Sequence, residues 1–434
     1  MNQQPGEAPL TQSGPNAIAT GTAPVSALPK ERFAGFDAFR VPAYRWYILC
    51  AVLQQTAESM KQLANGWFAY ELTGSTAILG LTILAQAVPQ TFMSLFGGVI
   101  ADRYPRHRVW QICNVAALLL PVWMATLVFT HTITWHALVI QSFLFGFVLA
   151  VRAPARQGIM TELVGRDRIM SAVSLNQTAN NILQFAGPAI AGFAIAWLGI
   201  QWVYVGMAVF YVFAILSLIP MKYQRRNVSL QSKGRGSVVA NLKDGLKYVG
   251  RNPDVKAVLG LTLLAGAFAM PYNQLLPAFG KSVLGIGPAK LGILASLTGI
   301  GALSGSLGIT LIRPKVRGVW LIRIVVITGV ALIAFSLSRS FAFAGAIIII
   351  IGVTQAVRQT LQSTLVQTYT EDAFLGRVIS INMAQMGLSS LTSFGVAIVA
   401  EAIGVRYAIL GTAFLLLGVG LSYFFLSRRL RDLV

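Results

Sequence analysis

Long apolar runs constrain this chain more than any other feature of its sequence. A helix that crosses a bilayer needs about 20 mostly apolar residues. Of the 434 residues 55% are apolar and 11% are charged, whereas a soluble globular chain carries about 25% charged residues, so an ordinary soluble enzyme is excluded. Runs of about spanning length are predicted at residues 46–70, 76–100, 109–129, 135–151, 172–198, 203–219, 255–279, 291–312, 319–337, 341–356, 378–403 and 407–426.

The basic residues predict the orientation of these spans. Lys and Arg number 34 against 14 Asp and Glu, a formal charge of +20. If both termini are cytoplasmic, all the basic residues fall on the cytoplasmic side except Lys61, which lies within a span, and Lys281, Lys290, Arg339 and Arg406. Positive residues favour the cytoplasmic side. The charge therefore predicts a multi-pass protein of the cell (inner) membrane rather than a nucleic-acid partner.

The polar stretches divide the chain into five segments. We expect a disordered cytoplasmic tail at 1–43, a six-helix bundle at 44–220, a cytoplasmic linker at 221–254, a second six-helix bundle at 255–426 and a cytoplasmic tail at 427–434. Apolar residues recur at helical spacing between Val239 and Val249, which predicts a short amphipathic helix on anionic lipid. A simple loop is the alternative.

The two bundles repeat each other. Arg156-Gln157, followed by Leu163-Val164, recurs as Arg358-Gln359, followed by Leu365-Val366, each time after the fourth span of its half. Gly98 and Arg103 likewise match Gly308 and Arg313 after the second span. Paired halves of this kind can rock around a site at the membrane midplane. The predicted fold is thus all-α, with twelve transmembrane helices in two pseudo-symmetric six-helix bundles.

Polar side chains recur on one face of several spans, whereas the third, sixth, ninth and twelfth spans are nearly apolar in their middles. Such side chains are tolerated in a membrane only where they face protein or water. The stripes predict a polar cavity, and hydrogen bonding between helices is the alternative for any single amide. The cavity candidates are Gln54, Gln62, Asn65, Gln86, Gln90, Gln141, Gln177, Asn180, Asn181, Gln184, Tyr272, Asn273, Gln274, Asn382 and Gln385.

One acidic residue, Glu58, is predicted near a membrane midplane. An ionised side chain there costs at least about 2.5 to 3.5 kcal/mol, so it needs a partner or a purpose. Glu58 is therefore a candidate for proton coupling or substrate contact. The alternative is a structural ion pair with Lys61, one turn away on the same face.

The segment Gly98-Val-Ile-Ala-Asp102-Arg103-Tyr-Pro-Arg106-His107-Arg108 resembles the loop signature of the major facilitator superfamily, with Pro105 where the pattern prefers Gly. The resemblance implies that Asp102 pairs with nearby arginines and with the positive end of a helix in the second half. A carboxylate at a helix N-terminus stabilises it by about 0.3 to 1 kcal/mol. This contact is expected to latch the halves together while the cavity faces outward.

Further motifs resemble the enterobactin-exporter-like group of efflux proteins. They include Arg152-x-Pro154-x-Arg156, Glu162-Leu163-Val164 and Gly376-Arg377-Val378. Gly187-Pro188-x-x-Ala191-Gly192 also resembles the helix-five motif of proton-coupled drug antiporters, although Leu183 and Ala191 replace glycines of that pattern.

Arginines at the cytoplasmic helix ends are gate candidates. We expect Arg152, Arg156 and Arg358 to pair with Glu162 or Asp102, with snorkelling membrane anchors as the alternative. The full set of latch and gate candidates is Gly98, Asp102, Arg103, Arg106, Arg152, Arg156, Glu162, Arg358 and Arg377.

These observations predict a secondary active transporter that exports amphipathic small molecules (a drug, siderophore or secondary metabolite) in exchange for protons by alternating access. No phosphate-binding loop for ATP is present, because Gly280-Lys281-Ser282 lacks the upstream glycine. We expect a monomer without cofactor, metal or enzymatic activity. A lipid flippase or a uniporter of the same fold is the alternative, and an intramembrane enzyme is disfavoured because His107, His131 and His136 are dispersed.

Overall fold

A computed structural model describes residues 34–165, 168–221, 238–312 and 316–433. After the 3-10 turn η1 (Ala34–Arg40), every element in these ranges is an α-helix. The first half contains α1 (Pro42–Thr73), α2 (Thr76–Arg103), α3 (Arg106–Phe129), α4 (Trp135–Val164), α5 (Ile169–Leu198) and α6 (Ile200–Leu218). The second half contains α7 (Val238–Arg251), α8 (Pro253–Ala269), α9 (Pro271–Gln274), α10 (Leu276–Ser282), α11 (Pro288–Ile312), α12 (Arg317–Leu337), α13 (Phe341–Tyr369), α14 (Asp372–Ile403), α15 (Val405–Leu426) and α16 (Arg428–Asp432).

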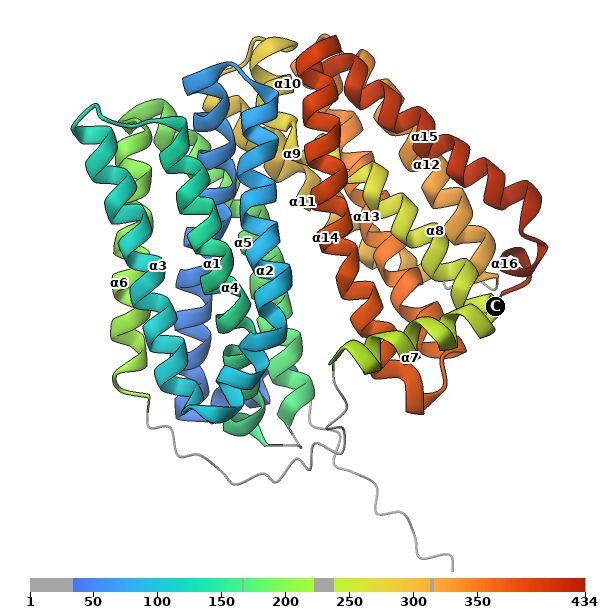
Figure 1. Cartoon of the computed structure of the whole chain (residues 1–434), viewed down its shortest axis with the longest axis horizontal. Coiled ribbons are helices and arrows are strands. Elements are labelled where there is room, and N and C mark those ends of the chain that lie inside the picture. Colours follow the sequence, from blue (N-terminus) through green and yellow to red (C-terminus); the bar gives the residue numbers. More distant parts are fainter. Residues whose placement is uncertain (1–33, 166–167, 222–237, 313–315, 434) are drawn as a thin grey trace, which may run out of the picture. The chain divides into compact units, whose positions relative to one another are not determined.

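Each half packs as its own helical bundle (Figure 1). In the first half α1 packs against α5 and α6, and α4 packs against α2 and α3. In the second half α13 packs against α11 and α12, and α15 packs against α12 and α14. An all-helical arrangement satisfies every backbone hydrogen bond within its own segment, as the interior of a bilayer requires.

Ten of the described helices are long and apolar enough to cross a membrane. The predicted spans at 46–70 and 378–403 lie in α1 and α14, which are not among the ten. The polar stripe that includes Gln54, Glu58 and Lys61 lowers the hydropathy of α1. Within α14, residues Gly387–Ile403 form a shorter apolar stretch.

The predicted span at 255–279 is not one continuous helix, which corrects the sequence-based boundary. The chain bends at Met270 and again at Leu275, so that α8, α9 and α10 follow one another. Pro271 and Pro277 explain the breaks, because proline lacks the N–H that continues a helix. Tyr272, Asn273 and Gln274 consequently lie on the short helix α9.

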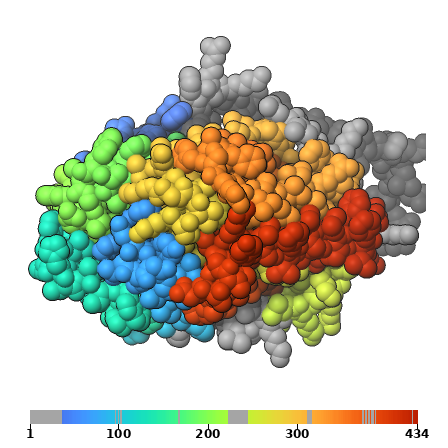
Figure 2. Space-filling view, turned by 90° about the horizontal axis from the view of Figure 1, so that it is seen from above, coloured from blue at the N-terminus to red at the C-terminus, as the bar shows by residue number. Residues whose placement is uncertain are grey.

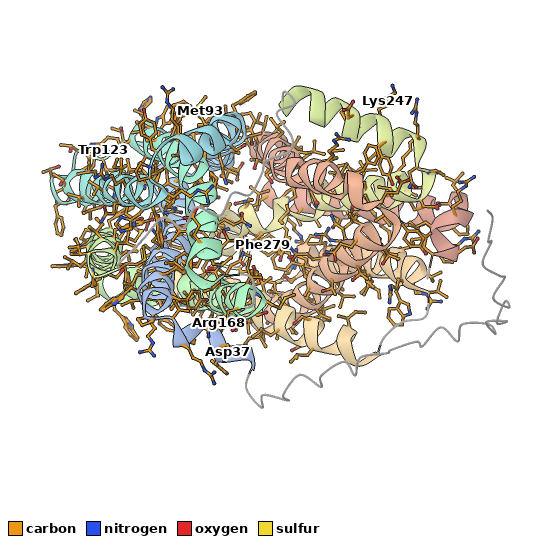
Figure 3. The ribbon with its side chains drawn as sticks, turned by 90° about the horizontal axis from the view of Figure 1, so that it is seen from below. Asp37, Met93, Trp123, Arg168, Lys247 and Phe279 are labelled. Atoms are coloured by element: carbon orange, nitrogen blue, oxygen red, sulfur yellow. The ribbon has the colours of Figure 1, made fainter. Side chains whose placement is uncertain are left out.

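The helix predicted in the linker is present as α7. Its residue Tyr248 stacks on Phe374 of α14, with ring centroids 4.3 Å apart, and the Tyr248 hydroxyl accepts a hydrogen bond from the backbone N–H of Glu371 (3.2 Å). Lys247, on the same helix, is exposed (Figure 3). One face of α7 is therefore covered by α14, and contact of α7 with lipid stays a prediction.

The two halves contact each other at the end of the bundles where the chain passes from α1 into α2. We call it the far end, because it lies opposite the end that carries Arg103 and Arg106. Here α2 packs against α14 and α1 packs against α10. Lys281 on α10 places its Nζ 5.5 Å from the centre of the Trp67 ring of α1. Figure 2 shows the far end, with the segment around α10 (yellow) next to the helices of the first half (blue).

Glycines form the crossing of α5 and α11 between the halves. A Cβ atom added to Gly292 would lie 2.6 Å from the Pro188 carbonyl oxygen and 3.1 Å from the Cα of Gly192. The missing side chains let the two helix backbones approach closely, as small residues do at membrane helix interfaces.

Gly292→Ala should therefore destabilise the folded protein, because overpacking costs about 1 to 3 kcal/mol. We expect a lower apparent unfolding temperature in detergent. Gly308→Ala on the same helix is the matched control, since its added Cβ would meet nothing within 4 Å. Equal unfolding temperatures for the two variants would contradict a tight crossing.

Candidate functional site

A buried ion pair joins α1 to α4. Arg152 Nη2 on α4 donates to Glu58 Oε1 on α1, and the two side chains are 4% and 18% exposed. The ion pair proposed from the sequence, between Glu58 and Lys61, is therefore replaced by one with Arg152. Two helices that are distant in sequence meet here, which the local spacing on α1 could not reveal.

Lys61 lies buried beside this pair, with 7% of its surface exposed. Its Nζ donates to Gln86 Oε1 on α2 (2.5 Å) and lies 3.8 Å from the centre of the Phe145 ring of α4. A cation over an aromatic face is stabilised by the ring quadrupole. An internal cavity of about 10 Å³, room for about one water molecule, is lined by Lys61, Gln141, Phe145 and Tyr211, among others.

Three of the predicted cavity residues lie instead in the core of the first bundle. Gln54 donates to Asn114 Oδ1 on α3, and Asn65 donates to Gln141 Oε1 on α4 (2.6 Å). Tyr204 on α6 donates to Asn65 Oδ1 (3.0 Å). These amides bond helices to one another, because a buried polar group without a partner is costly.

Asn114 and Tyr204 are two members of this network that the sequence reasoning missed. Both lie on spans, the third and the sixth, that are nearly apolar in their middles. A single Asn in an apolar span is itself a signal, since an amide in a membrane needs a polar partner.

The other cavity candidates differ in exposure. Gln62, Gln177 and Gln184 are exposed, and Tyr272 is buried. The side chain of Asn382 is outside the described part of the chain. The candidates that are partly exposed are Gln86, Gln90, Asn180, Asn181, Asn273, Gln274 and Gln385.

The predicted gate residues pair differently from the expectation. Glu162 pairs with Arg106 (2.9 Å), whereas Arg152 pairs with Glu58. Arg156 donates to Asn176 Oδ1 (2.7 Å) and to Asn180 Oδ1 (3.3 Å), both on α5.

The remaining latch candidates lie at the basic end of the bundles, the end of Arg103 and Arg106. Arg103 is exposed, and Gly98 has open space around its Cα. The Arg377 guanidinium lies 5.1 Å from the centre of the Phe374 ring. The side chain of Asp102 lies outside the described residues, so its latch role stays a prediction.

In the second half Arg358 on α13 is buried, with 7% of its surface exposed. Its Nη1 donates to Gln362 Oε1 (3.2 Å), Gln362 donates to Gln385 Oε1 on α14 (3.4 Å), and Gln385 donates to the Thr262 carbonyl of α8 (3.2 Å). Arg358 thus heads a chain of uncharged amides, and Glu162, one of its two expected partners, pairs with Arg106.

The glycines of the helix-five motif bring α5 close to its neighbours. Gly187 leaves no room for a Cβ against Ser59 of α1, and Gly192 faces Gly292 of α11. Pro188 between them is buried within α5, and its carbonyl oxygen faces Gly292. In this structure the motif serves close packing.

Glu58→Gln alone or Arg152→Met alone should lower the free energy of unfolding by about 3 to 5 kcal/mol. Each change removes one charge of the pair and leaves the other charge buried without its counter-ion. The double variant should recover much of that loss. A double-mutant cycle of unfolding in detergent measures this, with Glu71→Gln at the exposed end of α1 as the control. Additive single effects would contradict the pair.

Comparison with known proteins supplies the family. The family model described as transmembrane secretion effector matches residues 33–432. The staphyloferrin A transporter of Staphylococcus aureus is 24% identical over 378 residues, covering 85% of this chain and 92% of that protein. The enterobactin exporter EntS of Escherichia coli is 25% identical over 403 residues, covering 88% and 93%. The multidrug efflux pump Tap of Mycolicibacterium fortuitum is 24% identical over 387 residues, covering 86% and 92%.

Solved structures agree on the fold. The nucleoside transporter NupG superposes with a TM-score of 0.72 at 14% identity, covering 88% of this chain and 98% of that one. A bacterial homologue of the human lysosomal transporter Spinster, in an inward-facing, unoccupied conformation, gives a TM-score of 0.70 at 14% identity, covering 91% and 98%. The chain therefore belongs to the transmembrane secretion effector family and has the fold of the major facilitator superfamily.

Proposed function

We propose that this chain is a proton-coupled exporter of amphipathic small molecules, among them siderophores or drugs, that works as a monomer with cytoplasmic termini. The observation that carries the proposal is the buried Glu58–Arg152 pair, with Lys61 one turn away on α1. The siderophore and drug transporters among the relatives support the substrate class.

Glu58 is suited to carry the proton because its ionised form makes the ion pair with Arg152 that joins α1 to α4. When Glu58 accepts a proton, the ion pair is lost and Arg152 keeps an uncompensated charge in a low-dielectric interior. The Glu58 side chain keeps 18% exposure, which gives water and protons access. Proton binding therefore favours a different arrangement of α1 and α4, which couples the proton gradient to movement.

The far-end contacts suggest which element opens during transport. Glu401 Oε2 on α14 accepts hydrogen bonds from the backbone N–H of Thr76 (2.6 Å), from that of Ala77 (3.3 Å) and from Thr76 Oγ1 (2.9 Å). A carboxylate at a helix N-terminus, here that of α2, is stabilised by the helix dipole. We assign this contact to the closed far end of an alternating-access cycle.

Glu58→Gln should abolish substrate-evoked proton movement in proteoliposomes, a loss of at least about tenfold if one group carries the proton. A pH-sensitive dye reports the proton movement during transport of enterobactin, ethidium or lysophosphatidylcholine. Glu71→Gln, the same change at an exposed position of α1, is the matched control.

The same assay separates the alternatives. Substrate movement without proton movement in the natural sequence would contradict coupling and would indicate a uniporter. Movement of lysophosphatidylcholine alone would indicate a lipid flippase.

Glu401→Ala should favour opening of the far end, because the α2 N-terminus loses its acceptor across the interface. Spin labels at Leu72 and Tyr407, both exposed, report the separation of the halves by pulsed electron resonance after Cys50 and Cys113 are replaced by alanine. We expect longer distances in the variant than in the parent. Glu371→Ala, an exposed acid at the basic end of α14, is the control, and equal distances in all three proteins would contradict the assignment.

A further inference from the structure

The buried charges of the described helices do not balance. Lys61, Arg152 and Arg358 are buried cations on α1, α4 and α13. Glu58 is the acid that pairs with one of them, Arg152. Lys61 lies one turn from this pair and over an aromatic ring, whereas Arg358 lies in the other bundle with neither an acid nor an aromatic contact among the described residues.

Arg358 lies deep within its helix. It is 11 residues from the end of α13 at Tyr369, about 16 Å at 1.5 Å per residue. The start at Phe341 is farther away. The Arg358 side chain is therefore buried against neighbouring helices along the length of α13 and does not extend past the end of its helix.

The sequence of the second half supplies no acid to compensate this charge. Its acids lie at or near helix ends or on the linker and tail helices: Asp244, Asp254, Glu371, Asp372, Glu401 and Asp432. In the first half the repeat-related region contains Arg152 with Glu58 and Arg156 with the amides of α5. The repeat counterpart of Arg358 is Arg156, which is likewise bonded to amides, whereas Thr354 stands where the repeat has Arg152, so the second half has no counterpart of the Glu58–Arg152 pair.

The hydrogen bonds of Arg358 leave donors unused. Guanidinium has five N–H donors, and in the described part of the chain Arg358 contacts one acceptor, the amide oxygen of Gln362 on its own helix. A buried cation without an anionic partner is unfavourable by several kcal/mol. A buried arginine at position 358 is explained if an anion that is not part of the chain binds it and supplies the negative charge that the second half lacks at this depth.

We infer that Arg358 is the binding site for the negatively charged group of the transported molecule, and that the substrate class is an amphipathic organic acid with a carboxylate. This inference rests on the proposed export function and narrows it. A carboxylate suits the site because one guanidinium binds it through two parallel N–H bonds. A highly charged phosphate ester would need more cations than the second half offers at this depth.

The amides next to Arg358 complete the site. Gln362 and Gln385 link α13 to α14, and Gln385 is anchored on the Thr262 carbonyl of α8. A ligand that takes the guanidinium from Gln362 would loosen this chain of hydrogen bonds between three helices. Binding at Arg358 is therefore connected to the packing of the second bundle.

Three probes with the same apolar body test the inference: pyrenebutyrate, pyrenebutanol and pyrenebutylamine. The purified full chain in nanodiscs is titrated with each probe by fluorescence polarisation, and empty nanodiscs correct for partition into lipid. The carboxylate should bind roughly ten- to a hundredfold tighter than the alcohol, the range of a charge-assisted hydrogen bond. The amine should bind no tighter than the alcohol.

Arg358→Gln should remove the preference for the carboxylate and leave binding of the alcohol unchanged. Arg358→Lys should keep part of the preference, because it keeps the charge without the fork of donors. Arg339→Gln, which removes a charge from an exposed turn, should keep all of it. Unfolding temperatures of the variants show whether each is folded.

Three results would each overturn the inference. They are equal binding of carboxylate and alcohol by the natural sequence, failure of all probes to bind, and a preference for the carboxylate that survives Arg358→Gln.

A transport measurement separates the anion site from the export function. If pyrenebutyrate binds through Arg358 and a pH gradient does not move it, the export proposal fails and the anion site stands. If the alcohol and the amine are exported as fast as the carboxylate, export stands and the anion site fails.

Discussion

Buried charges and amides in this protein need hydrogen-bond or ion-pair partners, because the interior of a helical bundle has a low dielectric constant. The packing of the described helices supplies these partners. A buried ion is stable only with a well-placed counter-ion and further hydrogen bonds. The Glu58–Arg152 pair satisfies the requirement across α1 and α4, and the Gln54–Asn114 and Asn65–Gln141 contacts satisfy it for amides across neighbouring helices. These contacts fix which faces of α1, α3 and α4 turn inward.

The two halves meet the requirement differently. The first bundle contains an acid, its arginine partner and a lysine held by an amide and an aromatic ring. The second bundle contains Arg358 and uncharged amides. A pseudo-symmetric fold with an asymmetric charge distribution separates two tasks, which we propose to be proton coupling by the first half and recognition of an organic anion by the second.

The contacts between the halves also divide into two kinds. Where α5 crosses α11, glycine faces glycine, and the hydroxyl of Ser296 on α11 donates a hydrogen bond to the Phe185 carbonyl of α5 (2.5 Å), so this contact is close and uncharged. Where α2 meets α14, Glu401 accepts hydrogen bonds from the start of α2. Packing of small residues is insensitive to charge, whereas a carboxylate at a helix N-terminus loses its dipole stabilisation when the two separate. The contact made by the Glu401 carboxylate is therefore the one we expect to change when the halves move.

The sequence alone determined the helical membrane fold, the paired halves and the family resemblance, because apolar runs, basic loops and repeated motifs are local patterns. It also indicated Glu58 as an acid that needs a partner. The tertiary structure decided that the partner is Arg152, that Gln54 and Asn65 bond helices together, and that the span at 255–279 is broken. Spacing along one helix gives the face on which a side chain lies, and which helix covers that face depends on contacts between residues far apart in the chain.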